Sequence, residues 1–87
     1  MIEVKKKSDQ EFLVAIVEKD TRTEHEVTLD EEYYQILTDG EMTREELIKR
    51  SFEFLLEREP KESILSKFNL KIIKNYFPEY EEKIKIF

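Results

Sequence analysis

The feature that most constrains the fold of this chain is a helical segment with an unusually wide apolar face. Residues 44–58 follow Thr43, and Glu46 stands three positions after Thr43, which is the capping-box arrangement that starts a helix. At 100° per residue, the large apolar side chains of this segment cover an arc of about 200°, whereas a helix packed on one side needs roughly 100°. Pro60 ends the segment, because the residue before a proline is pushed out of the helical region. The helix therefore needs cover from two directions.

Three sources of cover are available to this helix: a sheet, the C-terminal helices, or a second copy of the chain. Phe54 lies at the border between the apolar arc and the charged side of the helix, so we predict that it faces outward. With Leu47 and Leu56 it forms a predicted protein interface. The occupant of that interface is a protein partner or a second copy of the chain, which would make a homodimer.

The first third of the chain has the pattern of β-strands. Ile2 and Val4 alternate with charged residues, and residues 23–29 alternate with His25, Val27 and Leu29 on one face. Residues 12–17 are apolar on both faces, as in a strand covered on both sides. Three antiparallel strands in meander order are the simplest arrangement. Whether the strand at 23–29 pairs within the chain or with a second copy stays open.

The remainder of the chain has helical signals. Asp30, or Thr28 with Glu31, can cap a short helix that ends before Gly40, the only glycine. Further short helices are expected from Pro60 to Phe68, from Leu70 to Tyr76 after an Asn69 cap, and after Pro78. The sequence thus predicts one α+β domain over residues 1–87, in which a meander of about three strands packs against three to five short helices.

The residue types leave little material for catalysis. The chain has no cysteine, one glycine and one histidine, which excludes thiolate zinc sites and glycine-rich phosphate loops. His25 lies on a strand whose adjacent residues point to the opposite face, and no serine stands in a Gly-x-Ser-x-Gly elbow. Ser51 lies on the apolar arc and is expected to bond a backbone carbonyl one turn earlier. We predict no enzyme activity, no catalytic residue, no cofactor and no metal site.

Charge and hydropathy indicate the compartment and the partner. Residues 30–59 carry 10 acidic and 4 basic side chains, and the whole chain has a net charge of −6, which weighs against binding to nucleic acid. The apolar run at residues 12–17 is shorter than the core of a signal peptide, and no run approaches the roughly 20 residues of a membrane span. We predict a cytoplasmic protein without a membrane segment.

The aromatic residues allow two interpretations. They can form a platform on which nucleic-acid bases stack, or they can pack between the short helices with their hydroxyls at the rim. Few basic residues surround the first two tyrosines, which favours packing, although Lys71 and Lys74 stand near the third. The residues concerned are Tyr33, Tyr34, Tyr76, Phe77 and Tyr80.

Two resemblances to known families follow from motif order. Residues 23–59 contain a strand (TEHEVTLD), a short helix (EEYYQIL), a turn (TDGEMT) and a longer helix, and this order resembles the ribbon-helix-helix repressors and antitoxins. That resemblance implies a strand that pairs with its twin in a dimer, with Glu24, Glu26 and Thr28 as groove-reading residues. The stretch SFEFLLEREPKESIL followed by YFPEY resembles a group of small uncharacterised prokaryotic proteins, which implies no particular activity.

The functional hypothesis from the sequence is a small non-catalytic intracellular protein-interaction domain. The width of the apolar arc and the lack of a chemical constellation favour it. The alternative is a DNA-binding regulator or antitoxin of the ribbon-helix-helix kind. Carboxylates at Glu24 and Glu26 count against this alternative, because they repel phosphates.

Overall fold

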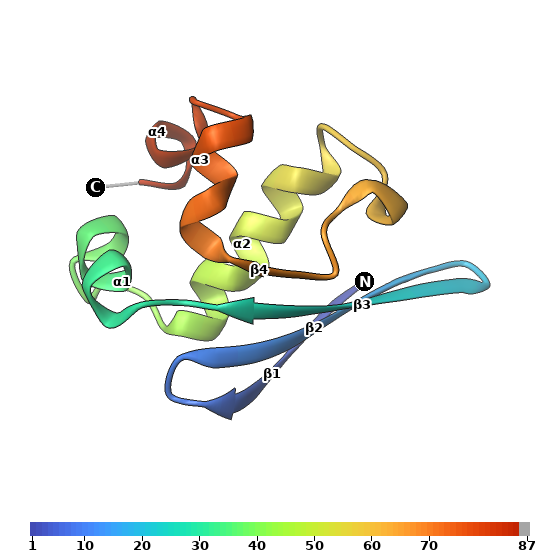
Figure 1. Ribbon diagram of the computed structural model, residues 1–87, viewed down its shortest axis with the longest axis horizontal. Coiled ribbons are helices and arrows are strands. Elements are labelled where there is room, and N and C mark those ends of the chain that lie inside the picture. The colour runs from blue at the N-terminus through green and yellow to red at the C-terminus, as the bar shows by residue number, and fades with distance from the viewer. Residues whose placement is uncertain (86–87) are drawn as a thin grey trace.

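The computed structural model describes residues 1–85 and has an α+β architecture, in which a twisted sheet lies below a set of short helices (Figure 1). This is the predicted fold class, and the four α-helices lie within the predicted range of three to five. The elements in chain order are β1 (Ile2–Ser8), β2 (Glu11–Glu18), β3 (Thr21–Thr28), α1 (Glu31–Thr38), α2 (Arg44–Leu56), the 3₁₀ turn η1 (Lys61–Ser63), β4 (Lys67–Asn69), the 3₁₀ turn η2 (Leu70–Ile72), α3 (Ile73–Tyr76) and α4 (Tyr80–Ile84).

The predicted meander is present, and its strands pair within the chain. β1, β2 and β3 are antiparallel neighbours, and Val14 of β2 stands opposite Val4 on one side and His25 on the other. β4 adds a fourth strand, parallel to β3, with Val27 opposite Phe68. A parallel pair requires a long crossover connection, and here the helices α1 and α2 supply it.

The prediction of a helix from Pro60 to Phe68 is wrong. Pro60 is followed by the single turn η1, and the chain then extends into β4. The spacing of Ile64, Leu65 and Phe68 fits one helix face, but the edge of β3 offers unpaired backbone groups that β4 satisfies. Phe68 also enters the core from this strand. Pairing with β3, some 40 positions earlier in the chain, makes residues 67–69 a strand. The spacing of apolar residues within a short segment gives no information about such a long-range pairing.

The expectation that both faces of β2 are covered is also wrong. The helices cover one face of the sheet (Figure 1). The alternate residues Phe12, Val14 and Ile16 are buried. On the opposite face Leu13 is 37% exposed, and charged residues of β1 and β3 surround it. Two ion pairs cross this face from β1 to β3 over the intervening β2, Arg22–Glu3 and Lys7–Glu26. Arg22 also pairs with Glu24 within β3, and both of its carboxylate partners stand opposite the small Ala15 in the sheet register.

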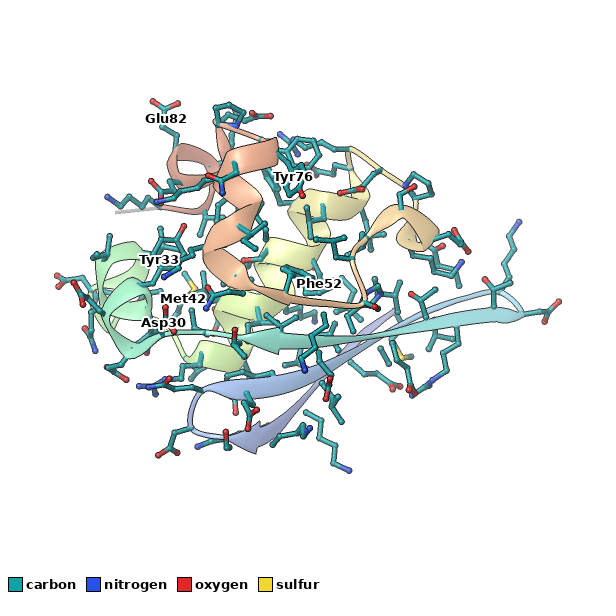
Figure 2. All side chains as sticks on the ribbon, viewed as in Figure 1. Asp30, Tyr33, Met42, Phe52, Tyr76 and Glu82 are labelled. Atoms are coloured by element: carbon teal, nitrogen blue, oxygen red, sulfur yellow. The ribbon has the colours of Figure 1, made fainter. Side chains whose placement is uncertain are left out.

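Helix α2 receives its two covers from within the chain. Thr43 caps its start, as predicted, by accepting a hydrogen bond from the Glu46 backbone N–H at 3.1 Å. Phe52 lies between α2 and the sheet, with ring centroids 5.5 Å from His25 and 5.9 Å from Phe68 (Figure 2). Leu47, Ile48, Ser51, Phe54 and Leu55 of the same helix are buried as well.

The prediction that Phe54 faces outward is wrong. Its side chain is 5% exposed and packs against Phe77 and Tyr80, at centroid distances of 5.9 and 5.3 Å. The Arg58 guanidinium covers the ring from the solvent side, 3.6 Å from its centroid. The chain reverses after Pro60, and this reversal brings the C-terminal residues back over Phe54. Leu47 is completely buried and Leu56 is half-buried, so neither forms an open surface with Phe54.

The strand at 23–29 lies inside the sheet. β2 occupies one edge of β3 along its whole length, and β4 occupies the other edge at Glu26–Thr28. A ribbon-helix-helix dimer needs this strand for pairing with its twin, so the arrangement of residues 1–85 departs from that family at the element that defines it.

One buried polar pair joins α2 to α4. The Ser51 hydroxyl donates to the Leu47 carbonyl at 2.8 Å, as predicted, and lies 2.7 Å from the Tyr80 hydroxyl. Tyr80 has no solvent exposure. Burial away from water disfavours the phenolate, and it raises the pKa of Tyr80 above the ordinary 10.0.

Replacement of Phe54 by alanine is expected to lower the free energy of unfolding by about 3–5 kcal/mol, because it leaves a cavity between α2 and the C-terminal cover. Urea denaturation followed by circular dichroism measures the loss. Ile36→Ala is the matched control, since Ile36 is 55% exposed on α1 and should cost less than about 0.5 kcal/mol. Equal losses in the two variants would contradict the placement of Phe54 in the core.

Alkaline pH is expected to destabilise the fold through Tyr80. The unfolded chain releases the phenol proton near pH 10.0, whereas the folded chain retains it. The contribution of Tyr80 to the free energy of unfolding is therefore fully present below this pH and decreases as the pH rises above it. The slope for one such group is at most about 1.4 kcal/mol per pH unit. Urea midpoints between about pH 9 and 11 measure it. Tyr80→Phe should give a shallower slope, whereas an unchanged slope would refute the assignment.

Candidate functional site

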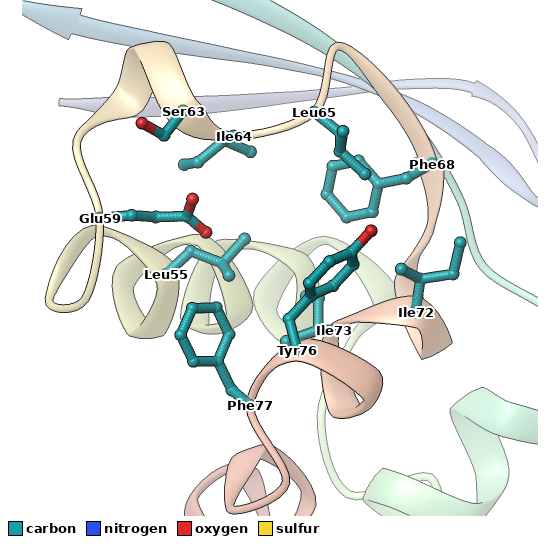
Figure 3. A pocket seen from close by; sticks show the side chains of 10 residues that line it. All are labelled: Leu55, Glu59, Ser63, Ile64, Leu65, Phe68, Ile72, Ile73, Tyr76 and Phe77. Atoms are coloured by element: carbon teal, nitrogen blue, oxygen red, sulfur yellow. The ribbon is translucent and has the colours of Figure 1, made fainter.

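An apolar cleft lies between the C-terminal end of α2, the segment around η1 and β4, and helix α3 (Figure 3). It encloses about 110 Å³. Most of its lining is hydrocarbon, with one carboxylate and two hydroxyl groups. The lining residues are Leu55, Glu59, Ser63, Ile64, Leu65, Phe68, Ile72, Ile73, Tyr76 and Phe77.

The cleft has a buried floor and an exposed apolar rim. Leu55, Ile64 and Ile73 are buried and belong to the core of the domain. Leu65 and Tyr76 stand at the rim and expose 47% and 66% of their surface. Figure 3 shows the Tyr76 ring between the strand that carries Phe68 and the start of α3, directed toward the Leu65 side of the cleft. Two large apolar side chains therefore remain in water next to a core that they do not enter.

Glu59 supplies the only carboxylate among the lining residues. Its backbone N–H donates to the Leu55 carbonyl at 2.9 Å, which fixes its position just past α2. The carboxylate reaches into the cleft between Leu55 and Ile64 (Figure 3). Within residues 1–85 this half-buried carboxylate has no ion-pair or hydrogen-bond partner, although cations stand close to it in the sequence.

The neighbouring cations are directed to other carboxylates. Arg58 Nε donates to Glu79 at 3.0 Å. A backbone hydrogen bond is the main cause of the lowered pKa of Glu79, and the bond from Arg58 is the second cause. Lys61 Nζ pairs with Glu62 at 2.8 Å and with Glu18 at 3.2 Å. The hydrogen bond from Lys61 is the main cause of the lowered pKa of Glu62. Both cations are thus engaged by other carboxylates, and among residues 1–85 the carboxylate of Glu59 is left without a cation partner at the end of α2.

His25 holds one wall of the cleft in place. The Leu65 carbonyl can only accept, so His25 Nδ1 donates to it at 2.7 Å, and Nε2 accepts from the Thr23 hydroxyl at 2.9 Å. The ring is 3% exposed and rests on Phe52. These contacts give His25 a structural role. Its target lies 40 positions away, so the sequence had no local signal for the contact.

The cleft has space for an apolar group, and its lining within residues 1–85 holds no histidine and no cysteine. His25 does not line the cleft, and the one carboxylate in that lining belongs to Glu59. Residues 1–85 hold no group of three or more His, Asp or Glu side chains arranged for a metal ion. The volume is well below the roughly 300–1,000 Å³ of small-molecule sites, and it approaches the roughly 150 Å³ that takes one benzene ring. One large apolar side chain fits this space.

The predicted interface residues do not contribute to the cleft. Leu47, Phe54 and Leu56 all lie outside its lining, and of the aromatic residues singled out in the sequence only Tyr76 and Phe77 belong to it. A signal was nevertheless present in three adjacent apolar pairs in short elements, in each of which one member is more buried than the other. These pairs are Ile64–Leu65, Ile72–Ile73 and Tyr76–Phe77.

Comparison with known proteins supplies no relative for this site. No protein family, no characterised protein and no solved structure matches the chain. The resemblance to small prokaryotic proteins through residues 51–80 thus stays a prediction. Between residues 1 and 85, the structure has no helix with the length and apolar composition needed to cross a bilayer.

Replacement of His25 by phenylalanine is expected to loosen the Leu65 wall, because it preserves the stacking on Phe52 and removes the donor to the Leu65 carbonyl. The free energy of unfolding should fall by about 1–3 kcal/mol. Amide hydrogen exchange should accelerate at residues 64–66. Thr23→Val is the matched control: it removes the bond at Nε2 only, so exchange at 64–66 should stay slow. Faster exchange in both variants would show that His25 acts through general stability.

Proposed function

We propose that this domain is a non-catalytic protein-interaction module that takes an apolar side chain of a partner protein into the cleft between α2 and α3. The observation that carries the proposal is the pairing of an exposed apolar rim, Leu65 and Tyr76, with a buried apolar floor. Binding hot spots are commonly a large side chain of one protein in such a pocket of the other. The partner is a segment of another protein, because the space suits a single side chain and the walls are mostly hydrocarbon.

Electrostatics favours a protein partner over nucleic acid. The two lysines nearest to Tyr76 have acidic partners: Lys71 pairs with Asp30 at 3.2 Å, and Lys74 lies 3.8 Å from Glu81. The carboxylate of Glu59 adds negative charge to the cleft itself. A phosphate backbone would meet repulsion at this surface with few free cations to offset it.

The intramolecular packing favours a separate partner over a homodimer through α2. The wide apolar arc was the reason to expect a second copy, and the C-terminal residues already cover Phe54. The pairing of β3 on both edges likewise argues against the alternative of a ribbon-helix-helix regulator. The cleft therefore offers the best remaining surface for recognition.

Selection from a display library of random linear peptides tests this function. We expect peptides that share one large apolar residue, and they should shift the amide resonances of residues 63–77 in an NMR titration. Leu65→Ser should weaken binding at least about 10-fold, which corresponds to the 1.4 kcal/mol expected of an anchor contact.

The matched control is Ile36→Ser, which removes an apolar side chain of similar exposure on α1. It should leave the affinity for the selected peptides unchanged. Recovery of no peptide by a folded domain, or shifts confined to other surfaces, would refute the proposed function.

A further inference from the structure

We infer that the partner segment carries a lysine or arginine close to its apolar anchor, and that this cation pairs with Glu59 in the cleft. The inference rests on the proposed function, since it gives the chemistry of the segment that the same cleft would take. Three observations carry it: the position of the carboxylate, the engagement of the neighbouring cations, and the small size of the apolar space.

The position of Glu59 makes it part of the binding surface. It is the last residue before Pro60, and its backbone bond to Leu55 sets the direction in which the side chain leaves the helix end. The carboxylate stands among apolar side chains at the end of the cleft that is farther from Ile72 (Figure 3). Binding of a group beside it removes water both from that group and from the Glu59 carboxylate.

An apolar partner alone would cover this carboxylate without compensation. Burial of an ionised carboxylate is strongly unfavourable unless a counter-charge accompanies it. Without a partner the side chain is half-buried and keeps part of its hydration, so the cost arises only when the cleft is filled. A cation on the incoming segment removes that cost and adds a charge-assisted hydrogen bond.

The chain's own cations do not supply this counter-charge. Arg58 is held by Glu79, by the Phe54 carbonyl and by the Phe54 ring. Lys61 is 5% exposed, and its amine is held by Glu18 and Glu62. Release of either cation toward Glu59 would break contacts that the structure makes with good geometry. The counter-charge is therefore expected from the partner.

The size of the cleft limits the distance between anchor and cation. One side chain of a partner is enough to fill the space of about 110 Å³. The residue of the bound segment that faces Glu59 is therefore within a residue or two of the anchor. The net charge of −6 further favours the approach of a cationic segment. Acidic and phosphorylated segments would meet repulsion from the same group.

The test uses a display library of linear peptides with one fixed leucine and randomised neighbours, selected against the wild-type domain and against Glu59→Gln. The amide keeps the shape of the side chain and removes its charge. We expect lysine and arginine beside the leucine to be enriched at least about 3-fold over the unselected library on the wild type, and not on Glu59→Gln. Glu53→Gln is the control, because that carboxylate is exposed, lies outside the cleft and pairs with no cation of residues 1–85.

The outcomes separate this inference from the function on which it rests. Leucine peptides that bind both proteins without basic enrichment would overturn the inference and leave the interaction module standing. Recovery of no peptide by either folded protein would overturn both. Basic enrichment that persists on Glu59→Gln, or disappears on Glu53→Gln, would assign the selectivity to the general negative charge of the domain and overturn the role of Glu59.

Discussion

The double cover of helix α2 is the constraint on which the rest of this structure depends. Phe52 packs toward the sheet through His25 and Phe68, and Phe54 packs toward the C-terminus through Phe77 and Tyr80. Burial of such large rings is the main favourable term in a domain of this size. Because both covers come from one chain, the apolar arc is satisfied without a second copy. The way in which the second cover is built also determines where a cleft can open.

That second cover consists of short elements, and the cleft lies where they meet. A single long helix over α2 would have closed the surface, whereas η1, β4, η2 and α3 change direction every few residues. Polar side chains tie these pieces to the rest of the fold: His25 holds the Leu65 carbonyl, and Ser51 lies within hydrogen-bond distance of Tyr80. Buried polar contacts of this kind specify one arrangement of short segments more narrowly than apolar packing does. These contacts fix the short segments of the second cover relative to β3 and α2.

The charges of the domain are arranged so that one carboxylate stays free at this site. Ion pairs across the open face of the sheet join β1 and β3, and Arg58 and Lys61 neutralise the carboxylates beside the end of α2. Exposed pairs of this type contribute little to stability, so their effect lies mainly in the distribution of charge. Glu59 is left in an apolar setting, where an incoming cation has the largest effect.

The sequence alone determined the α+β class, the three-stranded meander, the Thr43 cap and the need of α2 for two covers, because these features depend on local spacing and on residue type. It did not determine β4, the burial of Phe54 or the anchoring of Leu65 by His25. Each of these depends on groups 20–40 positions apart, and periodicity within a short window carries no information about such contacts. Three adjacent apolar pairs in the C-terminal third are a sequence feature that fits apolar surface left partly uncovered. Only the tertiary structure decided that the uncovered members meet at one cleft, since that requires the reversal after Pro60 and the pairing of β4 with β3.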